Sequence, residues 1–168
     1  MQTTIGYILS NFATIIIILA VITAIIRASL LSIKKTQKII EIFTSHIFFG
    51  VGLGLFWAGV FHVFIPKIAA SYIGWQTSPF QFEVGVGDMG MGLAAIIASI
   101  AGRGYRLAVI TYYAIFAYGA ALGHIYQMVQ YHDFAPGNAG LVFWLDILQP
   151  TVLIILLWLS RRYKGVTA

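Results

Sequence analysis

Long apolar runs separated by short polar stretches dominate the chain. Five of these runs hold enough apolar residues to cross a bilayer: about 5–26, 39–65, 80–101, 107–130 and 141–160. A hydrocarbon layer about 30 Å thick requires about 20 residues of helix, and a helix pairs its own backbone groups there. The pattern therefore predicts an all-α, polytopic membrane protein with five transmembrane helices, forming a single membrane domain over residues 1–168.

The connection at 66–79 differs from the other polar stretches because it carries apolar and aromatic residues. Ile68, Tyr72 and Trp75 suit a short helix lying at the membrane interface, with Pro66 in its first turn. Tryptophan and tyrosine commonly mark the headgroup level, so an aromatic anchor is the simpler interpretation and a lid is the alternative. The candidate lid or entrance residues in and around this connection are Trp75, Ser78, Pro79, Phe80 and Asn138.

Composition supports the membrane assignment and removes several mechanisms. Hydrophobic residues make up 60% of the chain and charged residues 9%, against about 45–50% and 25% in soluble domains. This excludes a water-soluble globular protein. The chain has no cysteine, which excludes thiolate metal sites, dithiol redox chemistry and disulfides.

The charged residues indicate an orientation. If connections alternate between the two sides, one side receives nine basic residues and the other receives Lys67 alone. The nine are Arg27, Lys34, Lys35, Lys38, Arg103, Arg106, Arg161, Arg162 and Lys164. By the positive-inside rule, the N-terminus lies outside and the C-terminus in the cytoplasm. The net charge of +5 is thus a topology signal that favours contact with the lipid bilayer and predicts no nucleic-acid partner.

Ionisable residues occur inside the predicted spans, where each costs about 2.5–3.5 kcal/mol near the bilayer centre. Helix rise places five of them at one level below the outer face: His62, Glu83, Asp88, His124 and Asp146. Three amides are available as partners: Gln81, Gln127 and Gln149. Buried ionisable groups often mark a ligand or proton site, although any single one is more often a structural hydrogen-bonding group.

Spacing determines which of these side chains can share a helix face. His124 and Gln127 are three residues apart, as are Asp146 and Gln149, so each pair lies on one face. Glu83 and Asp88 are separated by five residues, or about 140° around an ideal helix. Both can line one cavity only if it is wide or the helix is distorted, and otherwise one of them contacts a neighbouring helix.

Three functions are compatible with this polar layer. The first is binding or transport of a divalent cation, or of a small solute coupled to protons. Its metal ligands would be His62, Glu83, His124 and Asp146, a set that suits Zn, Mn or Fe. The second is an intramembrane enzyme in which one carboxylate and one histidine form an acid–base pair acting on a lipid or quinone-like substrate.

The third function is that of a structural subunit, in which the polar layer only sets the helix register. Two pairs of glycines four residues apart, here called glycine steps, occur at 50–54 and 119–123. They provide helix faces for a membrane-complex partner or a second copy. A GxGxxG spacing at 85–90 favours helix packing over dinucleotide binding, because no strand precedes it. Five spans do not divide into the paired halves of common transporters, which makes a homo-oligomer plausible.

Three sequence segments carry a resemblance: GWQTSPFQFEVGVGDMGMG, GHIYQM and APGNAGLVFWLDILQP. They resemble a family of small, functionally uncharacterised bacterial integral membrane proteins with a GWxxSPFQxE motif. The resemblance covers about 61–150 and implies a multi-pass protein of the bacterial inner (cytoplasmic) membrane. It implies that the following residues belong to the family pattern: Trp75, Ser78, Pro79, Phe80, Gln81, Glu83, His124, Asn138 and Asp146.

A more distant resemblance links helices two to five to DoxX-like four-helix membrane proteins. The shared features are a glycine-rich helix, an acidic residue before a second glycine-rich helix, and an arginine-led helix that ends in histidine. Some DoxX-like proteins are associated with quinone-linked redox complexes. This chain cannot run a dithiol relay, because it contains no cysteine.

Overall fold

The computed structural model describes residues 8–31 and 35–164, without the side chains of the last two, and every element in these ranges is a helix. The predicted all-α class is confirmed for this part of the chain. Residues 5–7 of the first predicted span and Lys34 lie outside it. The elements are α2 (Phe12–Leu30), α3 (Thr36–Phe64), α4 (Pro66–Ile73), α5 (Pro79–Ala98), α6 (Arg103–Tyr131), α7 (Pro136–Ala139) and α8 (Leu141–Lys164).

The five long helices are each apolar and long enough to cross a membrane, so the chain is a multi-pass membrane protein. They correspond to the five predicted spans, but several extend further. The second helix, α3, begins at Thr36 rather than near 39, and α2 continues past Arg27 to Leu30. Long basic side chains near a helix end can reach the headgroup layer, which allows the helix to continue beyond its apolar run.

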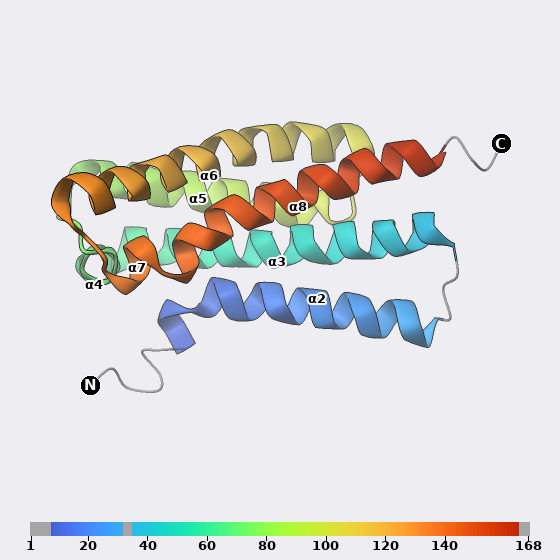
Figure 1. Cartoon of the computed structure of the whole chain (residues 1–168), viewed down its shortest axis with the longest axis horizontal. Helices are drawn as coiled ribbons and strands as arrows, with labels where there is room; N and C mark the ends of the chain where they lie inside the picture. The colour runs from blue at the N-terminus through green and yellow to red at the C-terminus, as the bar shows by residue number, and fades with distance from the viewer. Residues whose placement is uncertain (1–7, 32–34, 165–168) are drawn as a thin grey trace.

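The predicted interfacial helix is present as α4. Pro66 occupies its first turn, and Gly74 ends it in the left-handed conformation with φ of 88°. The sequence pattern did not predict α7, a four-residue helix inside the connection expected at 131–140. Both short helices lie at the same end of the bundle (Figure 1).

Helix α3 is the centre of the arrangement, and α2, α5 and α8 all pack against it (Figure 1). Glycines allow the closest of these approaches, between α3 and α5. A Cβ added at Gly52 would lie 2.7 Å from the carbonyl oxygen of Gly92, and one added at Gly59 would lie 2.5 Å from that of Gly85. Close backbone contact between small residues stabilises helix pairs in membranes.

The two predicted glycine steps have different surroundings. Gly50 and Gly54 face α2, where an added Cβ would lie 2.9 Å from the side chain of Ala20 and 3.2 Å from that of Ala13. By contrast, an added Cβ at Gly119 meets no atom of the described chain within 4 Å. An added Cβ at Gly123 would lie 4.0 Å from the Trp75 ring, so the second pair makes no close helix–helix contact in the described chain, unlike the first.

The bundle has two ends that differ in chemistry. The cavity end contains α4, α7, the ends of α3 and α6 and the starts of α5 and α8 (Figure 1). The basic end contains the starts of α3 and α6 and the ends of α2 and α8. Seven of the nine basic residues grouped by the topology argument have described side chains and belong to the basic end: Arg27, Lys35, Lys38, Arg103, Arg106, Arg161 and Arg162.

Candidate functional site

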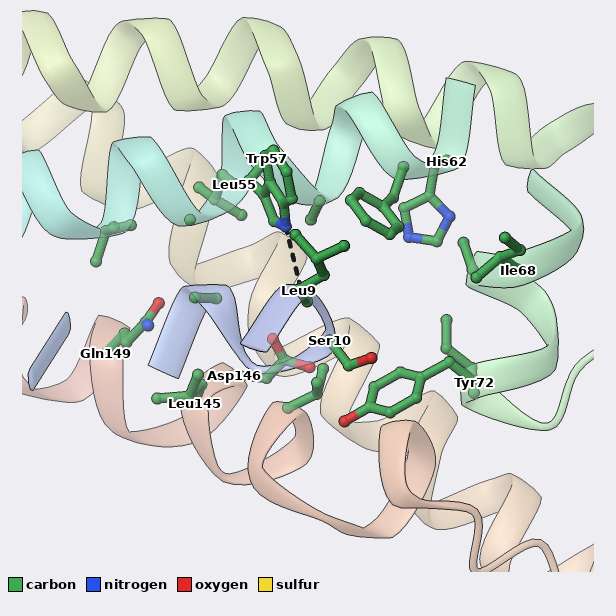
Figure 2. Close-up of a pocket in the computed structure, with 18 of the residues that line it drawn as sticks. Leu9, Ser10, Leu55, Trp57, His62, Ile68, Tyr72, Leu145, Asp146 and Gln149 are labelled. Atoms are coloured by element: carbon green, nitrogen blue, oxygen red, sulfur yellow. Dashed lines mark hydrogen bonds between the residues drawn. The ribbon is translucent and has the colours of Figure 1, made fainter. Parts of the chain in front are cut away.

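A cavity of about 180 Å³ lies at the cavity end. Its wall is formed by α3, α4, α8, the start of the described chain and Tyr113 of α6. Figure 2 shows Trp57 and His62 of α3 across the cavity from Asp146 and Gln149 of α8, with Tyr72 of α4 at one side. The other lining residues are mainly apolar, so the site is a small apolar cavity with a few polar groups on its wall.

Asn138 of α7 organises the polar residues behind this wall. Its Oδ1 accepts hydrogen bonds from Trp75 Nε1 at 3.2 Å and from His124 Nδ1 at 2.7 Å. Its Nδ2 donates to the carbonyl of Asp133 at 2.8 Å and, more weakly, to that of His124 at 3.4 Å. All the hydrogen-bonding groups of this fully buried side chain are therefore used, which fixes the orientation of its amide.

The fixed amide determines how His124 presents its ring. Because Asn138 Oδ1 can only accept, His124 Nδ1 carries a proton, and the other ring nitrogen faces Asp146. His124 Nε2 lies 3.5 Å from Asp146 Oδ2. Trp75 packs on the same imidazole, with ring centroids 5.4 Å apart. This arrangement holds the Nε2 side of a buried imidazole next to a carboxylate that lines the cavity.

Pro150 changes the backbone of α8 beside this carboxylate. Proline has no N–H, so the carbonyl of Asp146, four residues earlier, lacks its usual helical donor. One turn from Asp146, Gln149 Oε1 accepts a hydrogen bond from the Tyr113 hydroxyl. Gln149 Nε2 donates no hydrogen bond to any residue that the structure describes. The α8 wall thus offers both an acceptor, Asp146, and a donor, Gln149.

His62 lines the cavity from α3 and is held by Gln81 of α5. Gln81 Nε2 donates to His62 Nδ1 at 3.2 Å and to the carbonyl of Pro66 at 2.9 Å. Since Nδ1 accepts, neutral His62 carries its proton on Nε2. His62 and Gln81, two predicted members of the polar layer, are therefore brought together, and their contact connects α3, α4 and α5 beside the cavity.

Asp88 is buried in α5 and is not a lining residue of the cavity. Its Oδ1 atom makes no hydrogen bond with the described part of the chain. The groups within electrostatic range include Asp146 and the Tyr113 hydroxyl. A buried carboxyl with this environment is costly when ionised, so Asp88 differs from Asp146, which has an imidazole beside it.

Several predicted residues lie apart from this group. Glu83 is exposed on α5, because the five-residue step from Asp88 turns it to the outside of the helix. Gln127 contributes its backbone carbonyl, which accepts from the Asp133 amide at 3.3 Å, rather than its side chain. Three of the predicted entrance residues are exposed where α5 begins, away from the cavity lining: Ser78, Pro79 and Phe80.

The predicted metal ligands are not assembled as a set. Within residues 8–31 and 35–164, no group of three or more His, Asp or Glu side chains is placed to hold a metal ion. His124 and Asp146 meet, His62 binds Gln81 instead, and Glu83 points away. A Zn, Mn or Fe site made from His62, Glu83, His124 and Asp146 therefore does not follow from this geometry.

The sequence interpretation missed several cavity residues, including Trp57 and Tyr113, whereas Tyr72 was predicted only as part of the interfacial helix. Only Tyr113 had a usable signal. It precedes His124 by eleven residues, about three turns, with Ala117 and Ala121 between them on one buried face. Trp57 donates through Nε1 to the carbonyl of Leu9 at 3.1 Å, a contact between distant segments that no local pattern encodes.

Comparison with known proteins identifies the family of this chain. Residues 10–166 match the model of a family of unknown function, DUF6790, and the chain belongs to that family. The matched range covers every residue of the site described above except Leu9. No curated protein and no solved structure matches the chain.

Proposed function

We propose that this membrane protein binds a small, mainly apolar molecule in the cavity through a ring-sized head group that donates a hydrogen bond to Asp146. Quinol-like and phenolic lipids have this chemistry. The observation that carries the proposal is the apolar cavity of about 180 Å³ with the His124-supported carboxylate of Asp146 on its wall.

The size of the cavity limits what can enter. A dry cavity of about 150 Å³ accommodates a benzene ring. A chamber of about 180 Å³ therefore suits one ring or a comparable head group rather than a complete lipid. An attached apolar chain would have to leave the chamber between helices, where the surroundings are lipid.

The polar groups on the wall define the orientation of the head group. Asp146 accepts a hydrogen bond, and His62 and Gln149 have donors available to the cavity. A molecule with a hydroxyl at one position and a carbonyl or second hydroxyl at another can satisfy both kinds of wall group. The neighbouring His124 and Asp146 side chains would also provide an acid–base pair for such a hydroxyl.

A binding titration tests the proposal. The probe is a hydroquinone with a short alkyl chain, added to the purified protein in nanodiscs while tryptophan fluorescence is followed. Wild type should bind it saturably, and D146N should bind about 10–100-fold more weakly, since a hydrogen bond to a charged group contributes about 1.5–3 kcal/mol.

Two controls separate recognition from partitioning into lipid. E83Q removes a carboxylate from the exposed face of α5 and should leave the affinity unchanged. The dimethyl ether of the same hydroquinone cannot donate and should bind as weakly to wild type as the hydroquinone binds to D146N. Equal affinity of wild type and D146N, or equal affinity for the ether and the hydroquinone, would refute the role of Asp146.

A further inference from the structure

A second pocket lies at the opposite, basic end of the bundle. It has a volume of about 450 Å³ and is lined by residues from the start of α3, the α5–α6 connection, the start of α6 and the last turns of α8. Three basic side chains and one acidic side chain line it: Lys38, Arg103, Arg106 and Glu41. The proposed function uses none of them.

Two of these four side chains neutralise each other. Arg106 Nη1 lies 2.7 Å from Glu41 Oε1, and the rest of the Arg106 guanidinium is bound to the carbonyls of Ala98 and Ser99 and to Ser45 Oγ. The ion pair lines the pocket, and Arg106 has few N–H donors left for another ligand.

Lys38 and Arg103 keep unused donors. Arg103 Nη1 donates to the carbonyl of Leu157 at 2.6 Å and to Ser160 Oγ at 2.8 Å. These bonds hold the guanidinium against α8. Its Nε and Nη2 atoms bind no residue that the structure describes, nor does the exposed ammonium of Lys38. Two cationic groups with donors unused within residues 8–31 and 35–164 therefore flank a pocket whose one carboxylate is already paired.

We infer that this pocket binds the phosphate of an anionic phospholipid. The pocket lies where α3 and α6 begin and α8 approaches its end, which is the headgroup level of a protein whose long helices cross the bilayer. Basic pockets between transmembrane helices recognise anionic headgroups in this position. Arg103 supplies a planar guanidinium that is held against α8, and Lys38 supplies an ammonium group on a flexible side chain.

Native mass spectrometry of the purified protein tests this site. The protein is mixed with phosphatidylglycerol or with phosphatidylcholine of the same acyl chains, and the bound lipid is counted. Wild type should retain phosphatidylglycerol preferentially. The double variant K38Q/R103Q should lose about tenfold or more of that affinity.

A matched double variant controls for net charge. R161Q/R162Q removes two exposed charges from the same end of α8, outside the pocket lining, and should retain most of the preference. Because Arg103 also contacts α8, K38Q alone provides a variant that breaks no hydrogen bond of the described chain and should show a smaller loss of the same kind. Equal losses in the two double variants would overturn the pocket as the site.

Inorganic phosphate distinguishes the two sources of the anion. In neutral detergent without lipid, phosphate alone should not bind saturably, since the acyl chains anchor the headgroup at the bundle surface. Residue-dependent phosphate binding without preference between the two lipids would overturn the phospholipid assignment.

Discussion

Arg106 and Asp146 are ionisable residues of two packed helices, but their polar atoms are used in different ways. Arg106 is buried at the basic end and divides its guanidinium among two carbonyls, a serine hydroxyl and Glu41. Asp146 lies 3.5 Å from His124, a longer contact than any of those, and opens onto a cavity. A charged group whose hydrogen bonds are all satisfied fixes helix positions, whereas one that is partly satisfied can accept a ligand.

The largest expected effect on stability comes from removing the buried Arg106 guanidinium, whose nitrogen atoms all have partners. R106A should lower the free energy of unfolding by about 3–5 kcal/mol, because it leaves two carbonyls and one carboxylate without their donor. Equilibrium unfolding in mixed detergent micelles measures this loss. R161A removes an exposed arginine from the same end and should change stability little. Similar losses in both variants would contradict the structural role assigned to Arg106.

Removing the Asn138 side chain, which holds His124 beside Asp146, should have a smaller effect on stability. N138A removes four hydrogen bonds, which average about 0.6 kcal/mol each in membranes, so a loss of about 2 kcal/mol is expected. Nitrogen NMR of the His124 ring should also show loss of the fixed Nδ1 proton. An unchanged ring spectrum in N138A would mean that another group orients His124.

Asp88 tests the consequence of a buried carboxyl oxygen, Oδ1, that has no hydrogen bond in the described part of the chain. D88N removes a buried group that can ionise and should raise the free energy of unfolding at neutral pH by about 1 kcal/mol or more. The matched variant E83Q changes an exposed carboxylate of the same helix and should leave it unchanged. Destabilisation by D88N comparable to that of R106A would show that Asp88 has an essential charged partner.

The smallest expected effect concerns the other member of the basic-end pair. Glu41 contacts Arg106, but its side chain is 54% exposed. E41Q should therefore cost only about 0.2–1 kcal/mol in the same unfolding measurement, as is usual for exposed ion pairs. A loss as large as that of R106A would place most of the stabilisation in the ion pair rather than in the hydrogen bonds to the backbone.

The site could be predicted only in part from the sequence. Depth along each helix follows from counting residues, and that count grouped five ionisable residues at one level: His62, Glu83, Asp88, His124 and Asp146. Rotation about each helix axis does not follow from counting. It determines that Asp88 points inward while Glu83 is exposed, and that His62 binds Gln81 rather than a metal shared with His124.

The apolar runs by themselves determined that the chain is an all-helical, multi-pass membrane protein, because the bilayer penalises any unpaired backbone group irrespective of tertiary contacts. Only the tertiary structure decided which polar groups meet. Asn138 binds residues 63 and 14 positions away, and Trp57 reaches Leu9 across 48 positions. Such contacts depend on how whole helices are rotated and stacked, and no local periodicity specifies that arrangement.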